Sequence, residues 1–531
     1  MKRRDFLQTT AAGCVVTIAS PVSALAIEEP AHPRAPEPSS APPAFELDEW
    51  TIAQLQQAMT SGRYSSKQLV EKYSDRIGDI DKKGPAINSV IEMNPDAERI
   101  AADLDRERKE RGPRGPLHGI PLLIKDNLDT ADRMMTTAGS LALVGAKPAR
   151  DAGVVKKLRD AGAVILGKTN LSEWANFRST KSSSGWSGRG GQTRNPYVLD
   201  RNPCGSSSGS GAAAAANLCA ATIGTETDGS IVCPSSANSL VGIKPTLGKV
   251  SGAGIIPIAH SQDTAGPIAR TIADAWTLFN SIADVPLKPL AEYAREFNIK
   301  GLRLGVARKH FGFNERVDKL MDQCLAELKS LGVVLVDPAD IPTSGKFDDS
   351  EFEVLLYEFK ADLNAYLAAL GPTAPVRSLK DIIDFNEKNR DREMPYFGQD
   401  IMIKAQAKGP LTSKAYRDAL RKNQLLTRSQ GIDFVLKQHR LAALVAPTGG
   451  PPWPTDWING DHFTGGYSSA SAVAGYPHIT VPAGYVFGLP VGISFFGAAN
   501  SEPLLAQLAW GFEQATKARK PPRFLEKAEF G

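Results

Sequence analysis

Short apolar runs alternate with amphipathic stretches along most of this chain. The runs cover residues 119–124, 163–166, 302–307 and 333–336, and further runs begin at Ala442, His478 and Pro490. Runs of this length, separated by helical patterns, are typical of buried strands in a layered α/β protein. The sequence therefore predicts an α/β fold with a large, mostly buried sheet.

One helix is predicted from its two ends. Asn314 can accept hydrogen bonds from the first-turn amides, an apolar stripe follows over residues 317–331, and Gly332 offers a left-handed exit. Cys324 falls on that stripe, so we expect it in the core. Residues 348–440 are more polar and mostly helical in pattern, and we interpret them as a helical excursion that could cap a binding cleft.

The N-terminus has the layout of an export signal. Residues 1–26 contain Arg3-Arg4, a mildly apolar stretch and the small-residue site Ala24-Leu25-Ala26, which together resemble a twin-arginine signal peptide. The apolar run before Cys14 is short for a lipoprotein site. Residues 27–44 are rich in Pro and Ala and predict an extended tether, followed by a single domain over 45–531. We expect a periplasmic or secreted protein.

Composition excludes several classes of protein. The chain has 531 residues, of which 42% are hydrophobic and 23% charged, with a net charge of +4. No long basic stripe interleaved with aromatics occurs, so nucleic acid is not an expected partner. No second apolar run reaches the ~18 to 20 residues of a membrane span, which predicts no stable membrane insertion after signal removal.

The cysteines carry no metal-binding pattern. Beyond the signal they stand at Cys204, Cys219, Cys233 and Cys324, with no CxxC pair and no histidines at zinc spacing. We therefore expect no metal site. The sequence has no pattern that specifies an oligomeric state.

Two strings match known motifs in the wrong context. Residues 162–169 fit the phosphate-binding loop GxxxxGK[ST], but the loop positions are filled by the apolar residues Ala163-Val164-Ile165-Leu166. Residues 205–209 fit the nucleophile elbow GxSxG, with Ser207 as nucleophile and a catalytic histidine downstream. An elbow follows a buried strand, whereas the preceding residues 200–204 are loop formers. Neither motif is favoured.

A third string is longer and more specific. The Gly/Ser-rich residues 205–211 open a small-residue helix over 212–216, and Gly-Thr-Glu-Thr-Asp-Gly-Ser-Ile follows at 224–231. A flexible linker would not alternate with a helix and a strand. This segment resembles the hallmark of the amidase signature family. Similar blocks occur in order from about Phe45 to near the C-terminus, at residues 117–127, 136–140, 167–173, 242–246, 475–477, 480–484 and 488–492.

The resemblance implies a fold and a catalytic apparatus. The fold would be a large mixed central sheet covered by helices on both faces, and the activity would be hydrolysis of carboxamide C–N bonds through an acyl-enzyme. The resemblance assigns the nucleophile to Ser230, a bridging serine after a cis peptide bond to Ser206, and the base to Lys125. The backbone amides of Thr227, Asp228, Gly229 and Ser230 would form the oxyanion hole. Serine, lysine and backbone amides suffice for this chemistry, so no cofactor is implied.

Lys125 also has a physical reason to act as a base. It ends the apolar run that begins at residue 119, where burial would lower its pKa and favour the neutral amine. A second positive partner such as Lys168 would add to that shift. His118, next to the lysine motif, is expected to be structural.

The site departs from the usual family string GTDTGGSIR. Here Glu226, Asp228 and Val232 replace the first Asp, a Gly and the Arg, and Asp228 adds a side chain inside the expected oxyanion turn. This variant, with residues 167–179 and 184–197, most resembles the peptide amidase branch, whose members remove the C-terminal amide of peptides and release ammonia.

Several other functions stay open. One is a broad-specificity aliphatic or aryl amidase. Taking both amidase alternatives together, the expected partner is a small-molecule or peptide amide substrate. Another, from a different class, is a non-catalytic peptide-binding protein on an amidase scaffold. The export signal argues against the amidase-like component of glutamyl-tRNA amidotransferase, which works in the cytoplasm.

Overall fold

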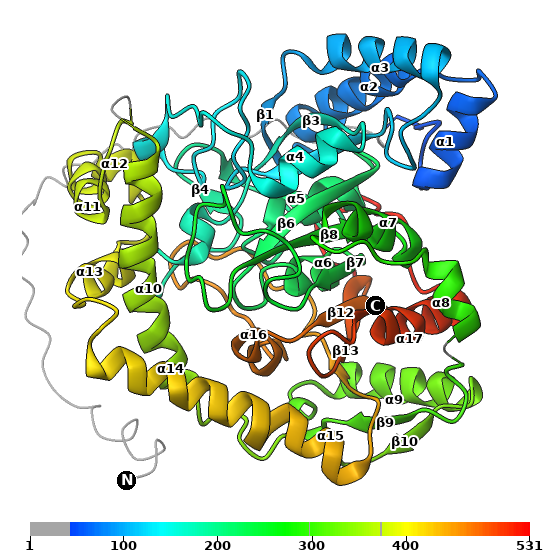
Figure 1. Ribbon diagram of the computed structural model, residues 1–531, viewed down its shortest axis with the longest axis vertical. Coiled ribbons are helices and arrows are strands. Elements are labelled where there is room, and N and C mark those ends of the chain that lie inside the picture. The colour runs from blue at the N-terminus through cyan, green and yellow to red at the C-terminus, as the bar shows by residue number, and fades with distance from the viewer. Residues whose placement is uncertain (1–42, 297, 372–373, 531) are drawn as a thin grey trace, which may run out of the picture. The chain divides into compact units, whose positions relative to one another are not determined.

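Eleven strands form one mixed sheet through the body of the protein (Figure 1). The computed structural model describes residues 43–296, 298–371 and 374–530. The strand order is β1-β3-β2-β6-β8-β7-β12-β13-β11-β9-β10. The strands are β1 Val90–Met93, β2 Pro121–Lys125, β3 Val164–Thr169, β6 Ala221–Glu226, β7 Val241–Lys244, β8 Thr264–Ala269, β9 Arg303–Val306, β10 Val334–Val336, β11 Ala443–Pro447, β12 His478–Val486 and β13 Leu489–Phe496. A separate hairpin pairs β4 Trp186–Ser187 with β5 Gly191–Gln192.

Helices cover both faces of this sheet. Every residue of the central strands β2, β3, β6 and β13 is buried. Because successive side chains of a strand point to opposite faces, burial of all of them requires a layer on each side. The α/β class and the mixed central sheet are therefore confirmed, and each predicted apolar run contributes a strand.

The helices that surround the sheet vary widely in length. They are α1 Ile52–Thr60, α2 Ser66–Arg76, α3 Ala97–Arg111, α4 Gly153–Asp160, α5 Ser208–Ala215, α6 Val232–Ala237, α7 Ile272–Ile282, α8 Leu290–Glu296, α9 Glu315–Ser330, α16 Ser469–Ala474 and α17 Glu502–Thr516. Helix α9 is the one predicted from its ends: Asn314 caps the amides of Arg316 and Val317, and Gly332 has φ +87°. Cys324 is buried, as expected.

The segment after β10 is a helical layer at one side of the molecule, green to yellow in Figure 1. Its helices are α10 Asp348–Ala369, α11 Leu379–Lys388, α12 Arg390–Glu393, α13 Asp400–Gln406, α14 Lys414–Thr427 and α15 Asp433–His439. Apolar residues of α10, α11 and α13 pack with Trp174 and Phe177 in a cluster of their own. Because both aromatics follow β3, this layer is fixed to the part of the chain that carries the signature motifs.

The N-terminal predictions fall outside the structure. The signal peptide, Cys14 and the tether as far as residue 42 lie outside the described residues. Among the residues that are described, none of the helices combines the length and apolar character that a bilayer crossing requires.

Candidate active site

The predicted site residues gather where two neighbouring strands end. Strands β2 and β6 are parallel partners in the centre of the sheet, so their carboxyl ends lie at the same edge. Lys125 is the last residue of β2, and the turn that carries Ser230 follows β6 directly. Ser206 stands two residues before helix α5, which leads into β6. The sheet topology thus brings three distant motifs to one place.

Close packing explains why the segment around Ser206 is rich in glycine and serine. A Cβ atom on Gly209 would lie 2.3 Å from the Ser89 carbonyl oxygen and 2.4 Å from that of Asn170. All residues of α5 are buried, so larger side chains have no room. The peptide bond between Gly205 and Ser206 is cis, as the family resemblance implied.

Lys125 and Ser206 are in direct contact. The Lys125 Nζ atom donates hydrogen bonds to Ser206 Oγ at 2.7 Å and to Thr225 Oγ1 at 2.9 Å, and it is fully buried. Burial lowers the pKa of Lys125 to about 7, although the more distant charges of Asp263 and Glu226 act in the opposite direction. A large fraction of the amine is therefore neutral near pH 7 and able to accept a proton.

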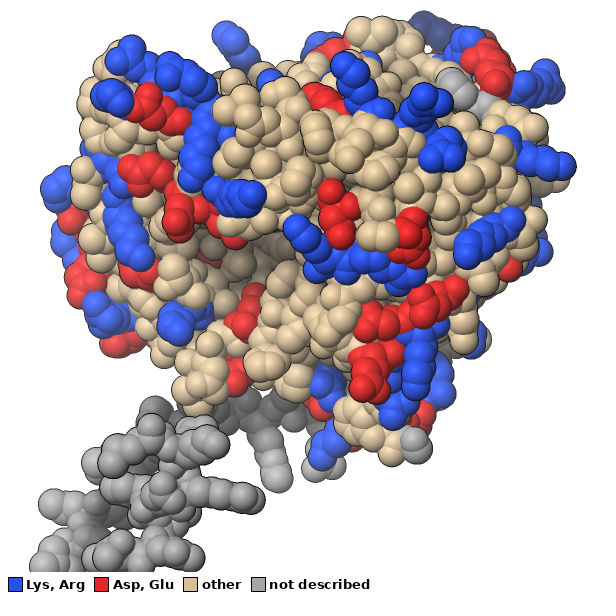
Figure 2. All heavy atoms as spheres, turned by 90° about the horizontal axis from the view of Figure 1, so that it is seen from below, with Lys and Arg blue, Asp and Glu red and all other residues tan. Residues whose placement is uncertain are grey.

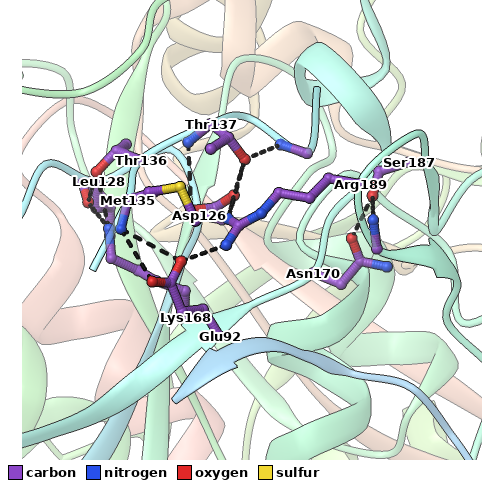
Figure 3. A network of polar contacts seen from close by, with 12 residues as sticks. Glu92, Asp126, Leu128, Met135, Thr136, Thr137, Lys168, Asn170, Ser187 and Arg189 are labelled. Atoms are coloured by element: carbon purple, nitrogen blue, oxygen red, sulfur yellow. Dashed lines mark hydrogen bonds and ion pairs between the residues drawn. The ribbon is translucent and has the colours of Figure 1, made fainter. Parts of the chain in front are cut away.

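Lys168 is not the charge partner of Lys125. On β3, its Nζ atom donates to the Leu128 carbonyl oxygen at 2.6 Å and to Thr136 Oγ1 at 2.9 Å, within the polar network drawn in Figure 3. That network includes the buried Asp126, which Arg189 contacts at 3.3 Å. The expectation that Lys168 adds to the shift of Lys125 is wrong, because the two side chains serve separate clusters and burial dominates the shift.

The turn after β6 presents unpaired backbone donors. The N–H groups of residues 227–230 donate to no described residue, and Gly229 has φ +78°, a conformation that favours glycine. Glu226 Oε2 accepts from the amides of Ile231 and Val232 at 2.7 and 3.0 Å and so fixes the end of the turn. Four unpaired donors in a buried turn can stabilise negative charge on an oxygen atom.

Ser230 closes this turn and has a free hydroxyl. Its side chain forms no hydrogen bond with any described residue, and the residue is 8% exposed. The Ser207 amide donates to the Ser230 carbonyl oxygen at 3.2 Å, which holds the backbone of the two serine motifs together. A serine hydroxyl in this position is available to a substrate, whereas that of Ser206 is already bound to Lys125.

The two rejected motifs have structural roles. Ser207 is completely buried, and its hydroxyl donates to the Thr225 carbonyl oxygen at 3.1 Å and accepts from the Thr225 amide at 3.2 Å, so it cannot reach a substrate. Residues 164–169 form strand β3 rather than a phosphate-binding loop.

His118 is buried and its ring bonds the Leu104 carbonyl oxygen at 2.9 Å, which confirms a structural histidine.

A disulfide that the sequence reasoning missed joins the two serine motifs. Cys204 and Cys233 are bonded, with their Cα atoms 5.9 Å apart. Cys204 precedes Ser206 by two residues and Cys233 follows Ser230 by three. The expected export signal was the available clue, because cysteines of exported proteins tend to pair. The spacing of the cysteines does not reveal which ones do.

One cluster among the described residues has the composition of a metal site. His260, Glu358 and Asp362 offer ligand atoms within 4.8 Å of one another. His260 Nδ1 bonds Asp362 at 2.8 Å, and that hydrogen bond raises the pKa of the histidine. Glu358 accepts from the Tyr416 hydroxyl at 2.7 Å. We interpret the cluster as an ion pair that ties residues 258–263 to α10.

Charged side chains are interspersed over the molecular face shown in Figure 2, which is hollowed near its centre. Lys and Arg alternate there with Asp and Glu. This face therefore has no single-sign stripe of the kind that tracks a nucleic-acid backbone.

Known proteins resemble this chain over most of its length. The family model described as amidase matches residues 68–506. The native peptide amidase of Stenotrophomonas maltophilia is 48% identical, with a TM-score of 0.86 over 91% of this chain and 100% of that chain. A probable amidase from Arabidopsis thaliana is 43% identical, over 91% of this chain and 93% of its own.

A third relative comes from a fungus. The putative amidase of Schizosaccharomyces pombe is 34% identical, over 90% of this chain and 87% of its own. The relatives thus share one scaffold over nearly the whole chain. This chain belongs to the amidase signature family and is a hydrolase that acts on amide bonds.

Proposed function

We propose that this protein removes the C-terminal amide of peptides, with Ser230 as nucleophile, Ser206 as proton bridge and Lys125 as base. The single observation that carries the mechanism is the 2.7 Å hydrogen bond from the buried Lys125 to Ser206, in a segment whose next residue, Ser207, is hydrogen-bonded to the backbone of Ser230. A serine becomes a nucleophile only when a neighbouring group takes its proton. The low pKa of Lys125, about 7, makes its neutral amine that group.

The proton follows the two serines. As Ser230 Oγ attacks the amide carbon, its proton passes to Ser206 Oγ, and the Ser206 proton passes to Lys125 Nζ. The unpaired amides of residues 227–230 stabilise the resulting oxyanion. Lys125 then returns a proton through Ser206 to the nitrogen, and ammonia leaves. Water hydrolyses the acyl-enzyme on Ser230 by the same relay.

An aromatic surface close to the serine motifs supports a peptide substrate. Trp457 stacks on Tyr396 with ring centroids 4.7 Å apart, although the two residues are 41% and 39% exposed. The Trp457 indole donates to Gln192, and Gln192 donates to the Ser184 carbonyl oxygen at 2.9 Å. A Cβ atom on Gly205 would lie 3.2 Å from Ser184 Cβ, so these rings are anchored to the chain that carries Ser206. Exposed aromatics suit the apolar side chains of a peptide.

Export through a twin-arginine-type signal to the periplasm or the medium is part of the proposal. Such a location would present the enzyme with peptides from outside the cell. The Cys204–Cys233 disulfide supports it, since disulfides persist in oxidising compartments. Cell fractionation, with mass spectrometry of the mature N-terminus, tests it: intact protein in the cytoplasm would contradict export.

The function is tested by ammonia release. The mature protein is given a C-terminally amidated peptide, the same peptide as a free acid and a small aliphatic amide, alongside its Ser230→Ala and Ser207→Ala variants. We expect release from the amidated peptide by the parent and the Ser207 variant, and none by the Ser230 variant. Turnover of the small amide alone would favour a broad-specificity amidase. Binding of the peptide without turnover of any amide would favour a non-catalytic peptide-binding protein.

A further inference from the structure

The oxyanion turn carries an acidic side chain that is tied to the rest of the protein. The Asp228 carboxylate accepts hydrogen bonds from the hydroxyls of Ser468 and Ser469, at 2.5 and 2.6 Å. Both serines lie at the start of α16. A second carboxyl group, that of Glu351 on α10, is in hydrogen-bonding contact with Asp228 and is only 8% exposed. The helical layer thus reaches the turn through one acidic residue.

Gln262 adds a second link between Glu351 and the turn. Its Nε2 atom donates to Glu351 Oε1 at 2.9 Å and to the Thr227 carbonyl oxygen at 3.2 Å. Gln262 is 2% exposed, and its Oε1 atom has no partner among the described residues. Gln262 therefore holds one oxygen of Glu351 and joins it to the backbone of the turn.

The charges around the pair decide which carboxyl group keeps a proton. Burial and the charge of Asp228 raise the pKa of Glu351 well above its usual value, with a further contribution from Asp348 on the same helix. Burial also raises the pKa of Asp228, but the hydroxyls of Ser468 and Ser469 oppose that rise.

The other groups that interact with Asp228 come from neighbouring elements. Lys244 on β7 favours its ionised form. Burial raises the pKa of Glu226 on β6 and of the Tyr467 phenol, and the charge of Asp228 acts in the same direction. The two hydroxyl donors and the lysine favour the ionised form of Asp228, and on this basis we assign the proton to Glu351.

We propose that Glu351 is a positioning residue for the oxyanion turn, because its protonated carboxyl group donates to Asp228 and holds Thr227 through Gln262. This inference rests on the proposed function, in which the turn binds the oxyanion. Loss of the Glu351 proton places two carboxylates against each other beside the developing negative charge. The turn then loses its support at high pH, and turnover falls.

Two substitutions separate positioning from simple packing. In Glu351→Gln, the amide can donate to Asp228 and accept from Gln262, but it cannot ionise. In Glu351→Leu, both hydrogen bonds are lost at a similar side-chain volume. The kcat and KM of both variants and of the wild type are measured with a small amide between about pH 6 and pH 10.

We expect the wild type to lose activity at the alkaline end. Glu351→Gln retains kcat within about threefold at pH 7.5 and lacks that alkaline decline. Glu351→Leu has a kcat lower by about 10- to 100-fold with KM within about threefold, the signature of a weakened oxyanion site. The inference is overturned by a wild-type profile without an alkaline decline, by a decline that Glu351→Gln keeps, or by equal losses in the two variants.

The Ser230→Ala variant, run in parallel, keeps the two proposals apart. An inactive wild type contradicts the proposed function. An active wild type with inactive Ser230→Ala, combined with any of the three overturning results, contradicts only the role of Glu351.

Infrared difference spectroscopy tests the proton without turnover. The wild type at pH 8 should have a protonated carboxylic acid band that Glu351→Gln lacks. This measurement does not depend on whether Glu351→Leu folds. The same carboxylic acid band in the wild type and in Glu351→Gln would refute the inference.

Discussion

Two buried lysines lie on neighbouring strands, and we propose a catalytic role for only one of them. Lys125 on β2 and Lys168 on β3 are both fully buried, and Lys168 is paired in register with Ile124. Lys168 binds a carbonyl oxygen and a hydroxyl in a network with buried acids, and Asp126 and Asp129 oppose the fall of its pKa that burial causes (Figure 3). Lys125 binds the hydroxyls of Ser206 and Thr225 and, at 3.3 Å, the Thr225 carbonyl oxygen, and the charges of Asp263 and Glu226 oppose the fall of its pKa that burial causes.

The comparison indicates what the proposed base Lys125 has that Lys168 lacks. Burial lowers the pKa of both amines, because the charged form loses its hydration. The partner groups differ: in the proposed mechanism Ser206 passes a proton to Lys125, whereas the described partners of Lys168 are the Leu128 carbonyl oxygen and the Thr136 hydroxyl. These contacts fit the proposed role of Lys125 in proton transfer and a structural role for Lys168.

The largest expected effect is at Lys125. Lys125→Met should lower kcat by at least about 10⁴-fold, because Lys125 is the group among the described residues that is hydrogen-bonded to the Ser206 hydroxyl. The melting temperature should stay the same or rise, since a buried amine is replaced by an apolar chain of similar volume. Steady-state kinetics and calorimetry measure both. Retention of even a tenth of the wild-type kcat would remove Lys125 from the mechanism.

The matched change at Lys168 should reverse that pattern. Lys168→Met removes a cation from beside Asp126 and leaves the Leu128 carbonyl oxygen unpaired, so the free energy of unfolding should fall by about 3 kcal/mol. The kcat of the folded fraction should stay within about threefold. Denaturant unfolding and active-site titration measure the two quantities. A loss of kcat as large as that of Lys125→Met would break the comparison.

The disulfide crosslinks the segments that carry Ser206 and Ser230 and does not include the Lys168 network. Replacing Cys204 and Cys233 by serine should cost about 2 to 4 kcal/mol of unfolding free energy, because the bond closes a loop between residues 29 positions apart. Chemical unfolding with and without reductant measures this cost. Replacing the buried, free Cys219 by serine serves as the control. A wild type whose free energy of unfolding is the same with and without reductant would argue against the bond.

The smallest expected effect lies outside both lysine sites. Trp457→Ala should raise KM for amidated peptides by about 5- to 20-fold and leave kcat/KM for a small amide unchanged, because only a peptide reaches the aromatic surface. The equally exposed Trp510, on α17, is the matched control. Equal changes for both substrates would remove the aromatic surface from peptide recognition.

Local motifs made much of the site predictable. Lys125 and Ser206 each stand inside a continuous signature string, and an apolar run before a lysine already indicates burial. Contacts between distant segments were beyond sequence reasoning. The Asp228 contact with Ser468 joins residues separated by 240 positions, and the placement of Lys168 depends on which strands are neighbours. A single sequence has no local pattern for either.

The pH dependence of kcat/KM tests the central claim about Lys125 most directly. With a small uncharged amide, the wild type should be inactive when Lys125 is protonated. The rate should therefore rise about tenfold per pH unit at low pH and level off above the lysine pKa of about 7, ahead of the alkaline decline expected from Glu351. Lys168→Met should show the same acid limb. A wild-type profile that is flat between about pH 5 and pH 8, or an acid limb that moves in Lys168→Met, would contradict the account.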